Sequence, residues 1–414
     1  MIIEDIITQH AEEASFLWFL RRLAVDAPHY SLADLAELDD RVEAHLDGLR
    51  IAADAGWTIC KEALAQEEPG EVFAAAALAF ESGMEDRINV VLEAACPDPE
   101  LSGGIVSAIG WLPYEQVRNY ISSLLQSKDP SHQRIGLAAS AVNRKDPGKA
   151  IVDALNGKEL SFKARALRAA GELGRVDLFS VVKRQLAAED KDCRFWAGWS
   201  SVLLGDRADG LALLKAVATS DSPFRERALN LALQVMDDAS AQTWLKEFAQ
   251  HPDWLRYAVI GAGVVGNPIR IPWLIEQMEV PELARVAGEA FSMITGIDIA
   301  YGDLEGEWPE GFEAGPTESP EDEDVELDPD EDLPWPDPTL IREWRDKNKG
   351  AFRNGTRYLL GQPISRENLQ QSLGKGFQRQ RAAAALELAI LQPGQPLFEV
   401  RAPGFRQKQI LGLN

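Results

Sequence analysis

The chain has 414 residues, of which 45% are hydrophobic, so it can form two or three domains or one elongated array and is not a disordered protein. Its net charge of −24 repels phosphate backbones and argues against nucleic acid as a partner. The three cysteines, Cys60, Cys96 and Cys193, are far apart and show no paired spacing. This pattern favours neither a disulfide framework nor a zinc cage, and it fits a reducing cytoplasm.

The first 65 residues carry long amphipathic helical patterns. The opening stretch, "MIIEDIITQHAEEASFLWFLRR", has acidic residues where a signal peptide needs basic ones. No apolar run in the chain reaches the roughly 18–20 residues that span a bilayer. Ser31, at the start of "SLADL", is typical of a helix N-cap. We expect residues 1–65 to be N-terminal capping helices of a cytoplasmic protein that has no membrane contact.

Residues 66–300 contain an internal repeat. Six similar segments begin at residues 131, 161, 191, 222, 252 and 281, which gives spacings of 30, 30, 31, 30 and 29 residues. Each has a Ser, Pro or Asp near a helix start, an Arg a few positions later and a run of small and apolar residues. A break rich in Gly, Asp or Pro follows, and then a second amphipathic run. Two less regular units precede them, at 71–96 and 101–127.

Two short helices cannot bury their apolar faces alone, so neighbouring units must stack. The pattern over residues 131–296 resembles HEAT-like repeats of the short class. It predicts an all-α fold, a right-handed α-solenoid of HEAT-like helical hairpins of about 30 residues per repeat, interrupted by an acidic loop insertion. The small residues of each first helix should let adjacent hairpins approach closely.

An arginine recurs at the same place in each repeat. The six positions are Arg134, Arg165, Arg194, Arg227 (or Arg225), Arg256 and Arg285. Acidic residues such as Asp129, Asp190 and Asp253 often precede them by three to five positions. We interpret the acids as helix caps and the arginines as their ion-pair partners in the same or the adjacent repeat. A functional basic stripe is the alternative, and it would need unpaired arginines.

The stretch "AVIGAGVVGNP", residues 258–268, contains the spacing of a dinucleotide-binding turn at Gly261, Gly263 and Gly266. Such a turn needs a strand before the glycines and a helix that begins at them. Here the phase of Arg256 places the stretch in the first helix of a repeat, and Pro268 ends that helix. We therefore expect no bound cofactor and predict that the glycines mark a close approach between hairpins.

Residues 301–338 form an acidic insertion rich in Pro and Gly. From 302 to 332 there are fifteen acidic residues and no Lys or Arg. The interpretations are a solvated linker, a loop pinned onto the solenoid and a partner-docking segment. Three large aromatic residues disfavour simple solvation. The candidate partner-binding residues are Trp308, Phe312, Asp322, Asp324, Asp330 and Trp335. The acidic run lacks the glycine and terminal Glu spacing of a calcium loop, so we expect no metal site.

Residues 339–414 are expected to hold the last helices and an extended Pro/Gly tail. This end is basic, with Lys375, Arg379, Arg381, Arg401, Arg406 and Lys408. Its charge is opposite to that of the insertion, which suggests an intramolecular contact between the two. A basic interaction surface is the alternative.

No motif for catalysis stands out. The five histidines show no metal-ligand spacing, and neither a nucleophile elbow nor a phosphate loop is present. Cys193 lies near Lys191 and Arg194, but we expect a buried structural thiol. These observations favour a binding protein over an enzyme. The alternative is a HEAT-like nucleic-acid-binding or DNA glycosylase-like enzyme with a tryptophan-lined groove, for which Trp199, Trp254 and Trp273 are candidates.

Motifs across most of the chain resemble those of an uncharacterised proteobacterial family with HEAT-like repeats. They include "CRFWAGWSSVLLGDR", "LRYAVIGAGVVGNP", "GEWPEGFEAGP", "DLPWPDP", "RNGTRYLLGQPI" and "LQPGQPLFEVRAPG". Members are often encoded beside type VI secretion genes. The resemblance implies a scaffold, adaptor or chaperone-like accessory protein whose partners are secretion effectors or spike-associated proteins. It supplies no catalytic residues.

Overall fold

The computed structural model describes residues 3–315 and 328–413. These residues form 22 α-helices, six short 3-10 turns and one two-stranded hairpin, so the predicted all-α class is confirmed. They divide into two compact units. Unit 1 contains residues 1–26, 30–213 and 389–414, and unit 2 contains residues 27–29 and 214–388. Within the described part of the chain, no helix has the length and apolar character needed to cross a membrane.

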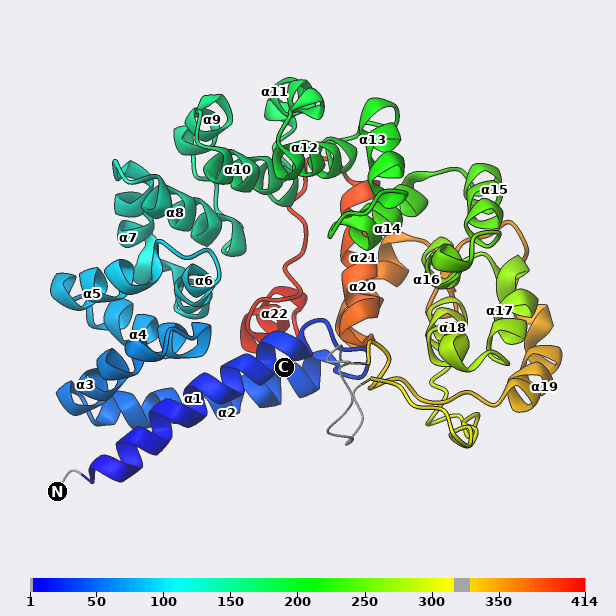
Figure 1. The fold of residues 1–414 in the computed structure, drawn as a ribbon, viewed down its shortest axis with the longest axis horizontal. Helices are drawn as coiled ribbons and strands as arrows, with labels where there is room; N and C mark the ends of the chain where they lie inside the picture. Colours follow the sequence, from blue (N-terminus) through cyan, green and yellow to red (C-terminus); the bar gives the residue numbers. More distant parts are fainter. Residues whose placement is uncertain (1–2, 316–327, 414) are drawn as a thin grey trace. The chain divides into compact units, whose positions relative to one another are not determined.

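Unit 1 is a succession of helical hairpins. Its helices are α1 (Glu4–Ala24), α2 (Leu32–Ile51), α3 (Asp54–Ala63), α4 (Pro69–Ser82), α5 (Glu85–Ala95), α6 (Leu101–Trp111), α7 (Tyr114–Gln126), α8 (Pro130–Val142), α9 (Lys149–Asn156), α10 (Leu160–Glu172), α11 (Phe179–Arg184), α12 (Lys191–Leu203) and α22 (Gly404–Leu411). Its 3-10 turns are Leu64–Gln66, Val176–Leu178 and Gln185–Ala187. The first helices of successive hairpins, α4, α6, α8, α10 and α12, pack side by side in that order (Figure 1). The predicted stacking of repeats is therefore present in this unit.

Acidic and hydroxyl side chains start many of these helices, as the sequence predicts. Ser31 and Asp34 form a capping box at the start of α2. The Asp129 carboxylate accepts a hydrogen bond from the Ser131 amide at the start of α8, and Asp190 accepts one from the Cys193 amide in α12. A carboxylate there satisfies free N–H groups and interacts favourably with the helix dipole.

Small residues bring the first helices close together. In α10, a Cβ atom on Gly171 would lie only 2.5 Å from the Ser200 Oγ and 3.0 Å from the Ser200 Cα of α12. The buried alanines of α4, Ala74 to Ala77, pack in the same core as α6. Each repeat therefore needs small side chains at these positions, because larger ones would separate the hairpins.

Unit 2 continues the hairpin pattern with α14 (Arg225–Val235), α15 (Asp238–Phe248), α16 (Leu255–Val265), α17 (Ile271–Gln277), α18 (Pro281–Thr295), α19 (Pro338–Asn348) and α20 (Arg366–Lys375). Its 3-10 turns are Pro252–Trp254, Pro268–Arg270 and Lys349–Ala351. The first helices α14, α16 and α18 again pack in order. Strands β1 (Tyr358–Leu359) and β2 (Gln362–Pro363) form an antiparallel hairpin. Helices α13 (Asp209–Ala218) and α21 (Gln378–Leu391) contain residues of both units.

The segment before and within the β hairpin caps the repeat helices of unit 2. The Arg357 guanidinium donates hydrogen bonds to the Val265 carbonyl of α16 and the Gln234 carbonyl of α14. The Leu360 and Gly361 amides donate to carbonyls in the last turn of α18. The last carbonyls of a helix have no partner within it, so this segment supplies partners to three neighbouring helices.

The C-terminal segment (Figure 1, red) supplies similar hydrogen bonds to helices of unit 1. The Leu397 amide donates to the Glu172 carbonyl at the end of α10, and the Arg406 side chain donates to the Leu112 carbonyl that follows α6. The Gly404 amide donates to the buried Asp39 carboxylate of α2, with 2.5 Å between N and Oδ2. Residues 392–403 contain no helix or strand, and a short helix, α22, follows them.

Two basic residues near the C-terminus have acidic partners outside the insertion. Arg379 pairs with Glu289 at 3.0 Å and Arg401 approaches Asp26 at 3.8 Å. The expected contact between this basic end and the insertion stays a prediction. Two acids of the insertion, Asp328 and Asp330, pair with Arg285 and Arg256 of the repeats. The sequence-based division into segments 1–65, 66–300, 301–338 and 339–414 stays a prediction.

Candidate functional site

The aromatic residues of the insertion come together into one cluster. The ring centroids of Trp308 and Trp335 are 5.0 Å apart, and Phe312 lies 5.8 Å from Trp308 and 5.5 Å from Trp335. We call these three residues the aromatic cluster. Asp322 and Asp324 lie outside the described residues. The structure thus joins three of the six predicted site residues through their rings.

Local backbone pairing positions the cluster. The Gly306 amide donates to the Trp335 carbonyl and the Asp337 amide donates to the Leu304 carbonyl, both at 2.8 Å. These bonds flank an isolated antiparallel bridge between Glu305 and Pro336. The two ends of the insertion are therefore tied together at its base, where the chain leaves and re-enters the helical part of unit 2. The Trp308 indole N–H donates to the Phe312 carbonyl at 2.8 Å, which fixes the orientation of its ring.

Arg285 of α18 contacts the rings of this cluster. Its guanidinium carbon lies 5.1 Å from the ring centroid of Trp308 and 5.7 Å from that of Trp335. The same guanidinium makes a bidentate contact with Asp328, with N–O distances of 2.6 and 2.9 Å. Planar arginine is suited to stack on aromatic faces while it pairs with a carboxylate.

A second arginine holds the insertion one repeat earlier. Arg256 of α16 makes a bidentate contact with Asp330, with N–O distances of 2.8 and 2.5 Å. Asp330 is 4% exposed, so this candidate residue is engaged within the chain. Burial alone would raise the pKa of Asp328, but the hydrogen bond and charge of Arg285 outweigh burial and lower it. The Asp328 carboxylate therefore helps to fix the insertion as an anion.

These contacts correct the predicted arginine ladder. Arg256 and Arg285 pair with acids of the insertion, not with acids of the repeats. Arg134 donates to the Ser102 hydroxyl, and Arg194 donates to the Ala188 carbonyl. Arg165 does pair within its own repeat, with Glu172 at 3.0 Å. The repeat acids act mainly as caps, which leaves the arginines available to other partners.

The aromatic cluster presents one residue to solvent. Trp308 is 51% exposed, whereas Phe312 and Trp335 are partly buried. A half-exposed indole with a fixed orientation can insert into a pocket of a partner and lose little conformational freedom. The sequence identified the aromatic residues but missed Arg256 and Arg285 as their supports. Arg256 and Arg285 occupy the same position in their repeats as the other recurring arginines, so nothing in the sequence singled them out.

The cysteines are not candidates for catalysis. Burial raises the pKa of Cys60, Cys96 and Cys193 to about 12. The thiolate is the nucleophilic form, so little of it is present near neutral pH. For Cys193 the nearby Asp190 adds to this effect, and the expected buried structural thiol is confirmed.

The glycine stretch is helical. Gly261 and Gly263 lie inside α16, and Gly266 is its left-handed C-cap with φ of 70°. A Cβ atom on Gly263 would lie 2.9 Å from the Cα of Ala290 in α18. The dinucleotide spacing is therefore a site of close helix packing, as predicted.

The tryptophans considered for a glycosylase groove each pack locally. Trp199 is buried and makes an edge contact with Trp196, and Trp254 packs on Phe248 and His251. Trp273 lies against the Arg270 guanidinium. None of these contacts forms a tryptophan-lined groove.

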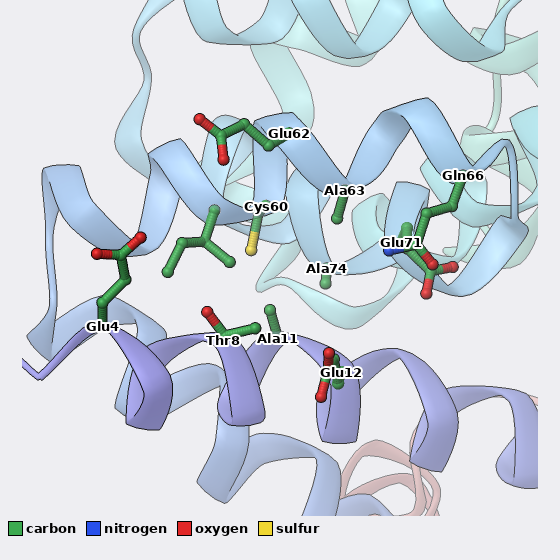
Figure 2. Close-up of a pocket in the computed structure, with 11 residues that line it drawn as sticks. Glu4, Thr8, Ala11, Glu12, Cys60, Glu62, Ala63, Gln66, Glu71 and Ala74 are labelled. Atoms are coloured by element: carbon green, nitrogen blue, oxygen red, sulfur yellow. The ribbon is translucent and has the colours of Figure 1, made fainter.

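An acidic hollow of about 260 Å³ lies between α1, α3 and α4 of unit 1 (Figure 2). Its glutamates are Glu4 and Glu12 of α1, Glu62 of α3 and Glu71 of α4. They are distributed along the hollow and do not converge on one point, and Cys60 lies between them. Within residues 3–315 and 328–413, no group of three His, Cys, Asp or Glu residues is arranged to hold a metal ion.

Comparison of the sequence with protein-family models and with curated proteins found no match.

Proposed function

We propose that the chain is a protein-binding scaffold, an adaptor or chaperone-like accessory protein, with the aromatic cluster as its docking point. In this proposal the hairpins are HEAT-like repeats in a right-handed solenoid, and recognition rather than catalysis is the activity. The half-exposed Trp308, held by Phe312, Trp335 and Arg285, is the observation that supports it. Tryptophan and arginine dominate the binding energy of many protein interfaces.

The charge of the insertion suggests the chemistry of the partner. Fifteen acidic residues and no basic ones lie between residues 302 and 332. A partner that binds here would carry an apolar pocket for Trp308 with basic residues around it. The resemblance to the secretion-associated family makes type VI effectors and spike-associated proteins the first candidates, in the cytoplasm, and it gives no reason to expect nucleic acid or a membrane.

The test is affinity purification from the native host followed by mass spectrometry. Wild type should enrich a defined protein over an untagged control, and Trp308→Ala should lose most of that enrichment because the anchoring ring is gone. Tyr301→Ala is the matched control, because Tyr301 is 91% exposed and belongs to no ring contact in the described structure. The proposal fails if nothing is enriched, or if Trp308→Ala retains the same proteins.

A further inference from the structure

A cavity of unit 1 has a volume of about 580 Å³ and lies between α1, α6, α8, α10 and the C-terminal segment. Seven arginines and three glutamates line it. The chain as a whole has a net charge of −24, whereas arginines outnumber carboxylates here, even when Asp39 and Asp26, which pair with Arg21 and Arg401 from outside the lining, are included. The lining residues all belong to unit 1.

The arginines reach this cavity from several elements. Arg134 comes from α8, Arg165 and Arg168 come from α10, and Arg406 comes from α22. The remaining three come from α1 and from the C-terminal segment. Convergence of one residue type from four parts of the sequence is not explained by the capping of any single helix.

Arg21, Arg22 and Arg401 each have a carboxylate partner, in Asp39, Glu100 and Asp26. The partners of the other four arginines leave positive charge uncompensated. Arg134 donates to the neutral Ser102 hydroxyl at 2.9 Å. Arg406 donates to the side-chain carbonyl of Asn143 and to a backbone carbonyl, at 3.1 and 3.0 Å. Arg165 and Arg168 share one carboxylate, that of Glu172, at 3.0 and 2.7 Å. A buried charge normally has an opposite charge beside it.

The electrostatic consequence appears in the titration of the same residues. Burial lowers the pKa of Arg134, Arg165 and Arg406, and the nearby carboxylates do not fully reverse the effect. The cationic form of each guanidinium is thus less stable in the cavity than in water. An anion that entered the cavity would restore the lost solvation.

We propose that this cavity binds a small organic anion that carries a phosphate group or several carboxylates. Guanidinium groups bind both in bidentate geometry, and the volume lies in the range of small-ligand sites, about 300–1,000 Å³. Trp18, Val106 and Val142 supply apolar wall for the body of the ligand. A small ligand fits better than a long polyanion, because the acidic remainder of the chain repels the latter.

The test uses pyrophosphate and citrate as probes with the full-length protein, at constant ionic strength with sodium chloride as the reference. Calorimetric titration should detect saturable binding of at least one probe to wild type. Arg134→Gln and Arg406→Gln should each weaken it by about tenfold or more, the usual effect of removing a charged hydrogen bond. Arg118→Gln should bind like wild type, because Arg118 is exposed on α7 and does not line the cavity.

Circular dichroism spectra will show that each variant is folded, and Arg134→Lys replaces Arg134→Gln if the latter is not. Lysine keeps the charge and loses the bidentate geometry, so binding should still weaken. The inference is wrong if neither probe binds wild type, or if binding is equal in the cavity variants. It is also wrong if only a phosphoserine peptide binds, since the ligand would then be a protein segment. Trp308 is no part of this cavity, so the result is independent of the scaffold proposal.

Discussion

Gly263 shows how a single position sets the distance between repeats. Its hydrogen atoms face the backbone of Ala290 in α18, and a methyl group there would lie 2.9 Å from the Ala290 Cα. At Gly261 the nearest atoms are the ends of the Leu245 and Leu233 side chains, which can rotate away. The contact with backbone, which cannot rotate away, is therefore at Gly263, although the sequence presents both glycines as equivalent.

We expect Gly263→Ala to lower the free energy of unfolding by about 1–3 kcal/mol, because backbone must move to admit the methyl group. The gain in helix propensity, at most about 1 kcal/mol, offsets only part of this. Gly103→Ala in α6 is the matched control, since no atom lies within 4 Å of its Cβ position. It should leave stability unchanged or raise it. Urea denaturation measures both, and a Gly263→Ala variant as stable as wild type would disprove the close-packing explanation.

The sequence patterns predicted where helix-capping residues lie better than they predicted which residues form ion pairs. The sequence correctly placed Asp129 and Asp190 at helix starts, because capping is a local interaction over two or three residues. It did not predict that Arg285 meets Asp328, because 43 residues separate them and many acids in the insertion are equivalent in sequence. The aromatic cluster was predictable as a set of residues, but its support was not.

At the scale of elements, hydrophobic periodicity identified the repeat helices. It did not predict strands β1 and β2 or helix α22, which lie near the ends of those helices. Helices α8, α10, α12 and α18 begin within one residue of the predicted repeat starts. Strands β1 and β2 have two residues each, which is too short for alternation to show. Helix α22 follows directly on a segment rich in Pro and Gly, which is typical of a loop. These elements owe their conformation to tertiary contacts.

Arg357 is the residue through which the hairpin segment stabilises unit 2. It donates to carbonyls of α14 and α16 and forms an ion pair with the buried carboxylate of Glu387, while its own side chain is partly buried. Arg357→Ala should lower the free energy of unfolding of this unit by about 3 kcal/mol or more, since Glu387 would lose its counter-charge. Arg353→Ala, at an exposed position nearby, should have little effect. Chemical denaturation followed by circular dichroism compares them, and equal stability of the two variants would contradict the capping role.

At the scale of the whole molecule, the chain divides into two units although the repeat pattern continues from one into the other. Periodicity reports which residues face a core, but it does not report how densely successive hairpins contact one another. Unit 1 also includes the residues from 389 onward, which no repeat pattern would assign to it. The sequence therefore predicted the helical hairpins but not their division into units 1 and 2.

Removal of residues 396–414 should destabilise unit 1. It would eliminate the hydrogen bonds from Arg21 to the Ala402 carbonyl and from Gly404 to Asp39, and the ion pair of Arg144 with Glu399. Hydrogen bonds to charged groups contribute about 1.5–3 kcal/mol each, so a clear loss of thermal stability is expected. Removal of residues 410–414 alone should have a small effect. Melting curves followed by circular dichroism decide the matter, and unchanged melting of the longer truncation would refute this role of the segment.

The same segment gives unit 1 an unusual order of assembly during translation. Arg21 and Ala402 are 381 positions apart, and Asp39 and Gly404 are 365 apart. A ribosome that adds about 5–20 residues per second needs roughly 20–80 s to bridge such a distance. During that interval helices α1, α2, α6 and α10 lack the hydrogen bonds that they make with the C-terminal segment in the folded unit. Contacts of such high sequence separation also slow folding after release. The hairpins can thus form as they emerge, but the contacts of Arg21 with Ala402 and of Asp39 with Gly404 form only after residue 404 has left the ribosome.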